Sequence, residues 1–195
     1  MFLQATDTAL QIESSFRDTL AYDLIIALIT GLLAAALFFL ALRIWKPRIK
    51  IGSKIVKTEK TDEKGNKTYI YTFKFINKTI SNIENVSIDL FLMEDYFNGS
   101  AKNYKTKKLK IAQPNFNFLT GTRNKNKEIH NNCVQMSIRE PLEDLWNGER
   151  EWLHLQIDST HSKSGRRAVN VKTYKDPLNT IVLGKFDSGD NFNII

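Results

Sequence analysis

An uncharged apolar segment of 19 residues, from Leu24 to Leu42, constrains this chain more than any other part of its sequence. An α-helix rises about 1.5 Å per residue, so the segment would be about 28 Å long, close to the thickness of a bilayer's hydrocarbon core. Tyr22 and Trp45 flank it, where interfacial aromatic side chains are common. We therefore expect residues 21–46 to form one transmembrane helix.

Basic residues are unequally distributed around this segment. Arg17 is the only one before it, whereas seven follow within the next 18 positions: Arg43, Lys46, Arg48, Lys50, Lys54, Lys57 and Lys60. Because positively charged flanks stay in the cytoplasm, the bias predicts an external N-terminus and a cytoplasmic C-terminal domain. We expect a single-pass protein of the bacterial inner membrane.

Small residues recur on one face of the expected span. Ala27, Gly31 and Ala35 are four positions apart, and such residues let helix backbones approach closely in a membrane. Thr30 is the only polar side chain in the segment. Its hydroxyl either bonds back to its own helix or lines a narrow pore at the axis of an oligomer.

The segments on either side of the span differ in character. Residues 1–20 have the periodicity of a short amphipathic helix, which we expect either to lie on the membrane surface or to form an oligomer contact or a lid. Pro47 should end the span. Residues 47–195 then provide one domain, and the single cysteine, Cys133, excludes an internal disulfide framework.

Alternating apolar residues predict that this domain is built from strands. Buried faces are expected where every second residue is apolar: at Tyr71, Phe73 and Phe75; at Val86, Ile88, Leu90 and Leu92; at Val134, Met136 and Ile138; and at Leu153, Leu155 and Ile157. A short strand is expected at Leu109 and Ile111, and a loop with His161, Ser162 and Gly165 before Val169 and Val171. Eight or nine short strands with little helix indicate a mainly β fold, an antiparallel sandwich or a small barrel.

The excess positive charge is concentrated in one region of the domain. The chain has a net charge of +7, and residues 99–130 contain eight basic residues against Glu128 alone. The basic residues are Lys102, Lys105, Lys107, Lys108, Lys110, Arg123, Lys125 and Lys127. The remaining residues are therefore neutral as a group.

This basic region is the best candidate for a binding site. Lysines beside Tyr104, Phe116 and Phe118 combine phosphate neutralisation with base stacking, a combination used on single-stranded nucleic acids. Arg166 and Arg167 could add bidentate phosphate contacts. The same residues also fit attraction to anionic lipid, or a solvated face with no specific ligand.

Motifs for catalysis, metals and cofactors are missing from the sequence. Only three histidines occur, and His130 with Cys133 makes a lone pair far short of a zinc site. His161 lies too close in sequence to Asp158 and Ser159 for the three to act as a catalytic triad. We therefore expect a protein that is not an enzyme and has no cofactor.

The order of a single span, the short junction RIWKPRIKI and a β-rich domain resembles two groups of proteins. The segment LHLQIDSTHSKSGRR is similar to part of the immunoglobulin-like cytoplasmic domain of inward-rectifier potassium channels, although no selectivity filter or second span is present. The whole arrangement resembles the small membrane effectors of nucleotide-controlled antiphage systems of the CBASS and Hailong kinds. That resemblance implies an oligomer that permeabilises the inner membrane when a β-rich sensor binds a signal.

These observations lead to one expectation and one alternative. The expected protein is a homo-oligomeric effector, with four copies as our guess, whose domain binds a nucleotide or single-stranded oligonucleotide that gates a pore. A partner nucleotidyltransferase would make the ligand. The alternative is an interaction or assembly module that uses the span only as a tether to the bilayer.

Overall fold

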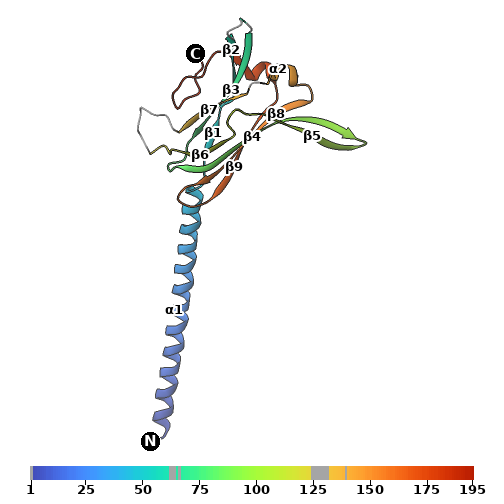
Figure 1. The fold of residues 1–195 in the computed structure, drawn as a ribbon. Coiled ribbons are helices and arrows are strands. Elements are labelled where there is room, and N and C mark those ends of the chain that lie inside the picture. The colour runs from blue at the N-terminus through green and yellow to red at the C-terminus, as the bar shows by residue number, and fades with distance from the viewer. Residues whose placement is uncertain (1, 62–64, 66, 124–131, 139) are drawn as a thin grey trace. The chain divides into compact units, whose positions relative to one another are not determined.

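The computed structural model describes residues 2–61, 65, 67–123, 132–138 and 140–195, with the backbone alone for residues 2–19 and 44. Two compact units divide the chain, a helical unit that ends at Ile44 and a β unit from Trp45 to Ile195. Figure 1 shows the elements of both units.

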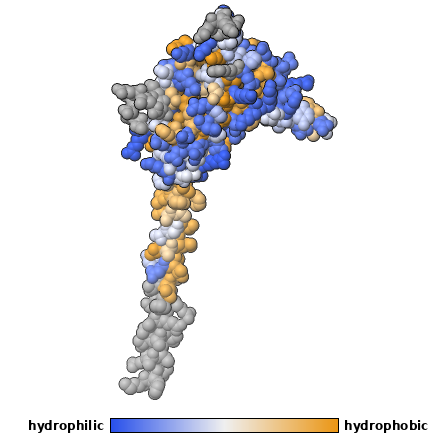
Figure 2. Space-filling model, viewed as in Figure 1, coloured by the Kyte–Doolittle hydropathy of each residue, from blue (hydrophilic) through white to orange (hydrophobic). Residues whose placement is uncertain are grey.

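The helical unit is a single helix, α1, from Phe2 to Ile44. Its stretch from Leu20 to Arg43 is long and apolar enough to span a membrane, and none of it is buried within the chain. Exposed apolar side chains cover this stretch, as Figure 2 shows, and lipid is the solvent that suits them. The helix continues through residue 20, where we expected a separate N-terminal segment to end. It stops three residues before Pro47, because the residue that precedes a proline disfavours helical backbone.

The β unit contains two sheets that, in the described part of the chain, have five strands each. In the first sheet, β3 pairs with β1, β2 and β7, and β10 lies beside β2. The order of the second sheet is β5-β4-β8-β9, and β6 also pairs with β4. The first sheet consists of β1 (Ile49–Ile51), β2 (Ile55–Thr61), β3 (Lys67–Asn77), β7 (Cys133–Ile138) and β10 (Ile181–Leu183). The second consists of β4 (Ile83–Asn98), β5 (Ala101–Leu109), β6 (Asn115–Leu119), β8 (Glu151–His161) and β9 (Arg167–Tyr174). Two short helices, α2 (Leu142–Leu145) and α3 (Pro177–Thr180), complete the unit.

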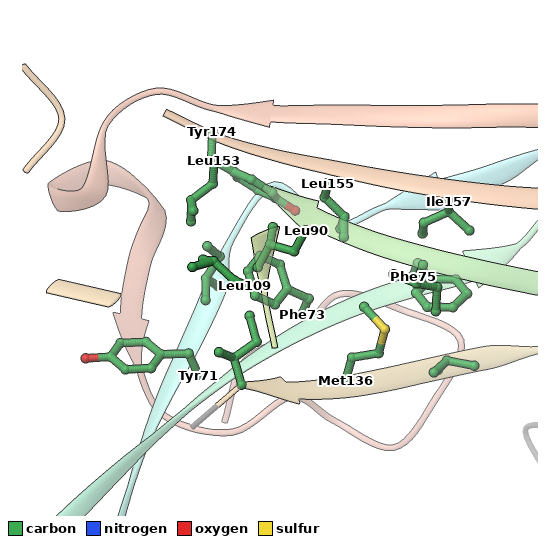
Figure 3. Close-up of a cluster of buried hydrophobic side chains, with 14 of the residues drawn as sticks. Tyr71, Phe73, Phe75, Leu90, Leu109, Met136, Leu153, Leu155, Ile157 and Tyr174 are labelled. Carbon is green, nitrogen blue, oxygen red and sulfur yellow. The ribbon is translucent and has the colours of Figure 1, made fainter. Parts of the chain in front are cut away.

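One hydrophobic core is shared by the two sheets. Buried side chains of the first sheet, including Phe73, Phe75 and Met136, belong to the same cluster as Leu90 and Leu155 of the second (Figure 3). Full burial of one such side chain contributes about 1.5 to 3 kcal/mol, so this cluster is the main source of stability in the β unit. The alternation of apolar residues in the sequence correctly predicted the inward faces of β3, β4, β7 and β8.

Three local predictions differ from the structure. The strand expected at Leu109 and Ile111 is the end of a longer strand, β5, that stops at Leu109. His161, expected in a loop, is the last residue of β8 and is buried. Strand β10 pairs with β2 in the parallel direction, so the mainly β fold is not purely antiparallel.

Candidate functional site

The lysine-rich segment at residues 102–108 lies within strand β5. Strand β5 pairs on one side with β4 and lies at the end of the strand order of the second sheet. Exposed lysines are common on edge strands because they hinder pairing with another chain. This role accounts for part of the positive charge without any ligand.

Carboxylates of β4 pair with three of these lysines. Lys102 Nζ lies 2.8 Å from Asp95 Oδ2, Lys108 Nζ lies 2.5 Å from Asp89 Oδ1, and Lys105 Nζ lies 3.7 Å from Glu94 Oε2. The net charge of this hairpin is therefore much lower than that of β5 alone. No acidic partner of Lys107 occurs among the described residues.

The other predicted phosphate ligands are dispersed. Arg167 lies on β9, where its Nε donates to Asp158 Oδ1 at 2.7 Å, and Arg166 is exposed just before that strand. Lys110 and Arg123 line two different grooves. Lys125 and Lys127 lie outside the described residues. The structure thus does not bring the predicted set together at one site.

Two of the predicted residues, Lys102 and Tyr104, do line a pocket, of about 350 Å³. The pocket lies at the junction of the β4–β5 hairpin with the start of β8. Tyr104 meets Trp152 edge to face, with ring centroids 5.6 Å apart. The residues that line the pocket are Asp95, Lys102, Tyr104, Gly148, Glu149, Arg150, Glu151, Trp152 and Lys175.

Strand register explains why these side chains meet. Asp95 pairs with Tyr104 across β4 and β5, so both point to the same face of the sheet. Trp152 pairs with Met93 across β4 and β8, which places its ring on that face as well. Because Leu153 points into the core, its neighbour Trp152 must point outward.

A glycine turn brings the remaining wall of the pocket into place. Gly148 has a φ of 82°, a conformation that side chains disfavour. A Cβ there would lie 2.4 Å from Cδ of Pro177, so the chain at the start of α3 packs closely against this turn. Lys175, two residues before Pro177, thereby reaches the pocket.

The pocket has as many acidic as basic residues, but not all of their polar atoms have hydrogen-bond partners. Lys102, Arg150 and Lys175 face Asp95, Glu149 and Glu151. The hydrogen bond to Asp95 raises the pKa of Lys102, which therefore stays charged at neutral pH. In contrast, Asp95 Oδ1 is buried and has no hydrogen-bond partner in the described part of the chain. A buried acceptor without a donor is costly, so a ligand that displaces the group covering this oxygen and donates a hydrogen bond to it would bind favourably.

Sequence reasoning missed Trp152, Arg150, Lys175 and the acidic residues of this pocket. The signal for Trp152 was its position directly before the alternating Leu153, Leu155 and Ile157, which predicts an outward aromatic side chain. The signal for Asp95 was weaker, since its pairing with Lys102 depends on the strand register. Lys175 carried no signal, because the fold alone brings it near.

The small residues of the span are exposed on α1. Ala27, Gly31 and Ala35 belong to the exposed part of this helix, and a Cβ on Gly31 would meet no atom within 4 Å. The Thr30 hydroxyl donates to the carbonyl of Ile26 at 2.7 Å, as expected for a threonine bonded to its own helix.

No group of three metal-binding side chains occurs among the described residues. Comparison of the sequence with protein-family models and with curated proteins finds no match.

Proposed function

We propose that this chain is a membrane-anchored nucleotide sensor, and that the pocket at Tyr104 and Trp152 is its ligand-binding site. The observation that carries the proposal is the combination of an accessible aromatic pair, the cation Lys102 and the unsatisfied acceptor Asp95 Oδ1 in one pocket. Stacking and phosphate neutralisation are the two interactions that bind nucleotides and single strands without reading their sequence.

Each part of a nucleotide has a partner in the proposed complex. The base stacks on Trp152 and contacts Tyr104 with its edge, and its exocyclic amino group donates to Asp95 Oδ1. Lys102, Arg150 and Lys175 neutralise phosphates. This assignment favours adenine, guanine or cytosine over uracil, which has no exocyclic amino group.

The distribution of basic residues supports the orientation we propose. One arginine precedes the span and seven basic residues follow it closely, so the β unit would face the cytoplasm of a bacterial cell, where nucleotides are present. An immunoglobulin-like sandwich or small barrel is the arrangement that we propose for the two sheets.

We further propose that the response to the ligand is a pore made by several copies of α1, four in our working model. A lone helix cannot enclose a path for water, whereas the face with Ala27, Gly31 and Ala35 would allow close packing between copies. To move an equilibrium between a closed and an open state from 1:99 to 99:1, the ligand must bind the favoured state more tightly than the other by about 5.5 kcal/mol. Phosphate contacts repeated in each subunit are a source of such a difference. The parallel with antiphage effectors, including a nucleotidyltransferase as the source of the ligand, belongs to the same proposal.

Leakage from proteoliposomes tests the pore. Full-length protein should release a trapped dye when ATP or a single-stranded tetraadenylate is added on the side of the β unit. The variant A27L/G31L/A35L should not, because leucines separate the helices. As the matched control, I25L/I29L/L33I changes the opposite face and should leak like the wild type. Equal leakage from all three proteins, with or without ligand, would reject gating by this helix face.

A tethered interaction module is the second candidate, and an exposed apolar surface favours it. Val169 and Val171 point outward from β9 and are 50% and 49% exposed, although valine is usually buried. Sizing of the full-length protein in detergent separates the two functions, since a pore requires an oligomer and a tether does not.

A further inference from the structure

A groove separate from the Trp152 pocket lies between three loops of the β unit. It has a volume of about 270 Å³ and is lined by Ile80, Ser81, Asn82, Arg123, Ser162 and Lys163. Two of these residues are cations, three others have neutral side chains that can donate hydrogen bonds, and none is acidic. This lining suits a phosphate group.

Hydrogen bonds between the loops hold the groove in shape. Asn82 bonds to both neighbours, since its Oδ1 accepts from Gly121 N at 3.0 Å and its carbonyl accepts from Ser162 N at 3.2 Å. Gly121 allows the close approach, because a Cβ there would lie 2.3 Å from the carbonyl oxygen of Ile80. Arg123 N donates to that same carbonyl. The groove is therefore built by the fold and not by chance contact of long side chains.

Two of the three loops also bond to the first residues of the β unit. Ser164 Oγ donates to the carbonyl of Trp45 at 2.9 Å, and Thr79 Oγ1 accepts from Arg48 N at 2.8 Å. Trp45 is only two residues beyond Arg43, where the membrane-spanning stretch ends. The loops of the groove are thus hydrogen-bonded to residues that directly follow the membrane-spanning stretch in the chain. The headgroup layer on each side of a bilayer is about 5 to 8 Å thick, so residues that follow a span this closely lie at the level of the phospholipid headgroups.

An exposed isoleucine favours a lipid over a soluble phosphate as the ligand. Ile80 is 59% exposed on the wall of the groove, beside Arg123 and Lys163. An apolar side chain flanked by cations matches the boundary between acyl chains and anionic headgroups.

We infer that this groove binds the phosphodiester headgroup of an anionic phospholipid, with Arg123 and Lys163 as its charged ligands. Binding would fix the β unit against the membrane surface. This lipid site is independent of the proposed nucleotide site, because the pocket at Tyr104 and Trp152 is lined by different residues of the β unit.

Native mass spectrometry of the full-length protein in detergent tests this inference. Wild-type protein should retain added phosphatidylglycerol and not phosphatidylcholine. A cation near an anionic surface strengthens binding about fivefold, so the variant R123Q/K163Q should bind phosphatidylglycerol about 25-fold more weakly. R123K/K163R keeps both charges and should retain the lipid, and K60Q/K185Q, with two exposed lysines outside the groove, should behave like the wild type.

Two results would overturn the inference. One is equal retention of phosphatidylglycerol by R123Q/K163Q and the wild type. The other is displacement of the lipid by inorganic phosphate at equal concentration, which would assign the groove to a soluble anion.

Discussion

Tyr104 and Trp152 meet nearly at right angles, with an interplanar angle of 86°, although 47 residues separate them in the sequence. Strand β4 lies between their strands and pairs with both, so the register of β4 brings the two rings together. Their contact depends on the fold of the whole second sheet. The same strand pairing brings a cation, the aromatic pair and an unsatisfied carboxylate oxygen together in one pocket.

Replacing Asp95 with asparagine should change the choice of base. The unpartnered Oδ1 of Asp95 accepts from an exocyclic amino group in our account. Asparagine can still accept this hydrogen bond but has no charge, so D95N should weaken ATP binding about tenfold, the difference between a charge-assisted and a neutral hydrogen bond. UTP offers no amino group, and its affinity should change less. Titration calorimetry with both nucleotides on wild-type and variant protein measures the difference. An equal loss for ATP and UTP would contradict the assignment.

Replacing Leu155 of β8 and replacing Val171 of the neighbouring strand β9 should have different effects on stability. Leu155 is completely buried in the core, so L155A should lower the free energy of unfolding by about 2 to 5 kcal/mol. V171A, on β9 and 49% exposed, should change it by about 0.5 kcal/mol or less. Denaturant unfolding of the full-length protein in detergent gives both values. Similar losses for the two variants would mean that the core is placed wrongly.

His161 should make the stability of the β unit depend on pH. Its Nδ1 accepts a hydrogen bond from Ser164 N at 3.1 Å, and burial, followed by the charge of Lys163, lowers its pKa below 6.5. The unfolded chain therefore binds a proton more readily than the folded one. The contribution of His161 to stability is complete above about pH 6.5 and decreases as the pH falls toward its folded pKa.

The variant H161N provides the control for this pH dependence. Asparagine can still accept a hydrogen bond from Ser164 but does not titrate, so its thermal midpoint should fall less than that of the wild type between about pH 7.5 and 5.5. Parallel decreases in the two proteins would show that other groups cause the effect.

The sequence predicted the strands of the core because each has one buried face. Phe73 and Phe75, or Leu153 and Leu155, alternate with polar neighbours and carry the period-2 signal of a half-buried strand. Strand β5 has no such signal, since only Leu109 of its residues reaches the core and lysine is uncommon in strands. The hydrophobic pattern could therefore not show that the basic region is an edge strand.

The candidate site was predictable only in part, for the same reason. Lys102 and Tyr104 lie close together in the sequence and were predicted as ligands, whereas Trp152 and Lys175 join them through pairing over long separations. The ion pair between Lys102 and Asp95 also follows from register, and local charge counts cannot show it. Counting lysines thus overestimated the positive charge that is available to a ligand.

Titration of the full-length protein with ATP and with single-stranded tetraadenylate tests the central claim most directly. Stacking on an aromatic side chain contributes about 1 to 3 kcal/mol per base, so W152A should weaken binding roughly 5- to 150-fold. F118A removes another exposed aromatic side chain, outside the pocket, and should bind like the wild type. If W152A binds both probes as tightly as F118A and the wild type do, or if the wild type binds neither, the pocket is not a nucleotide site.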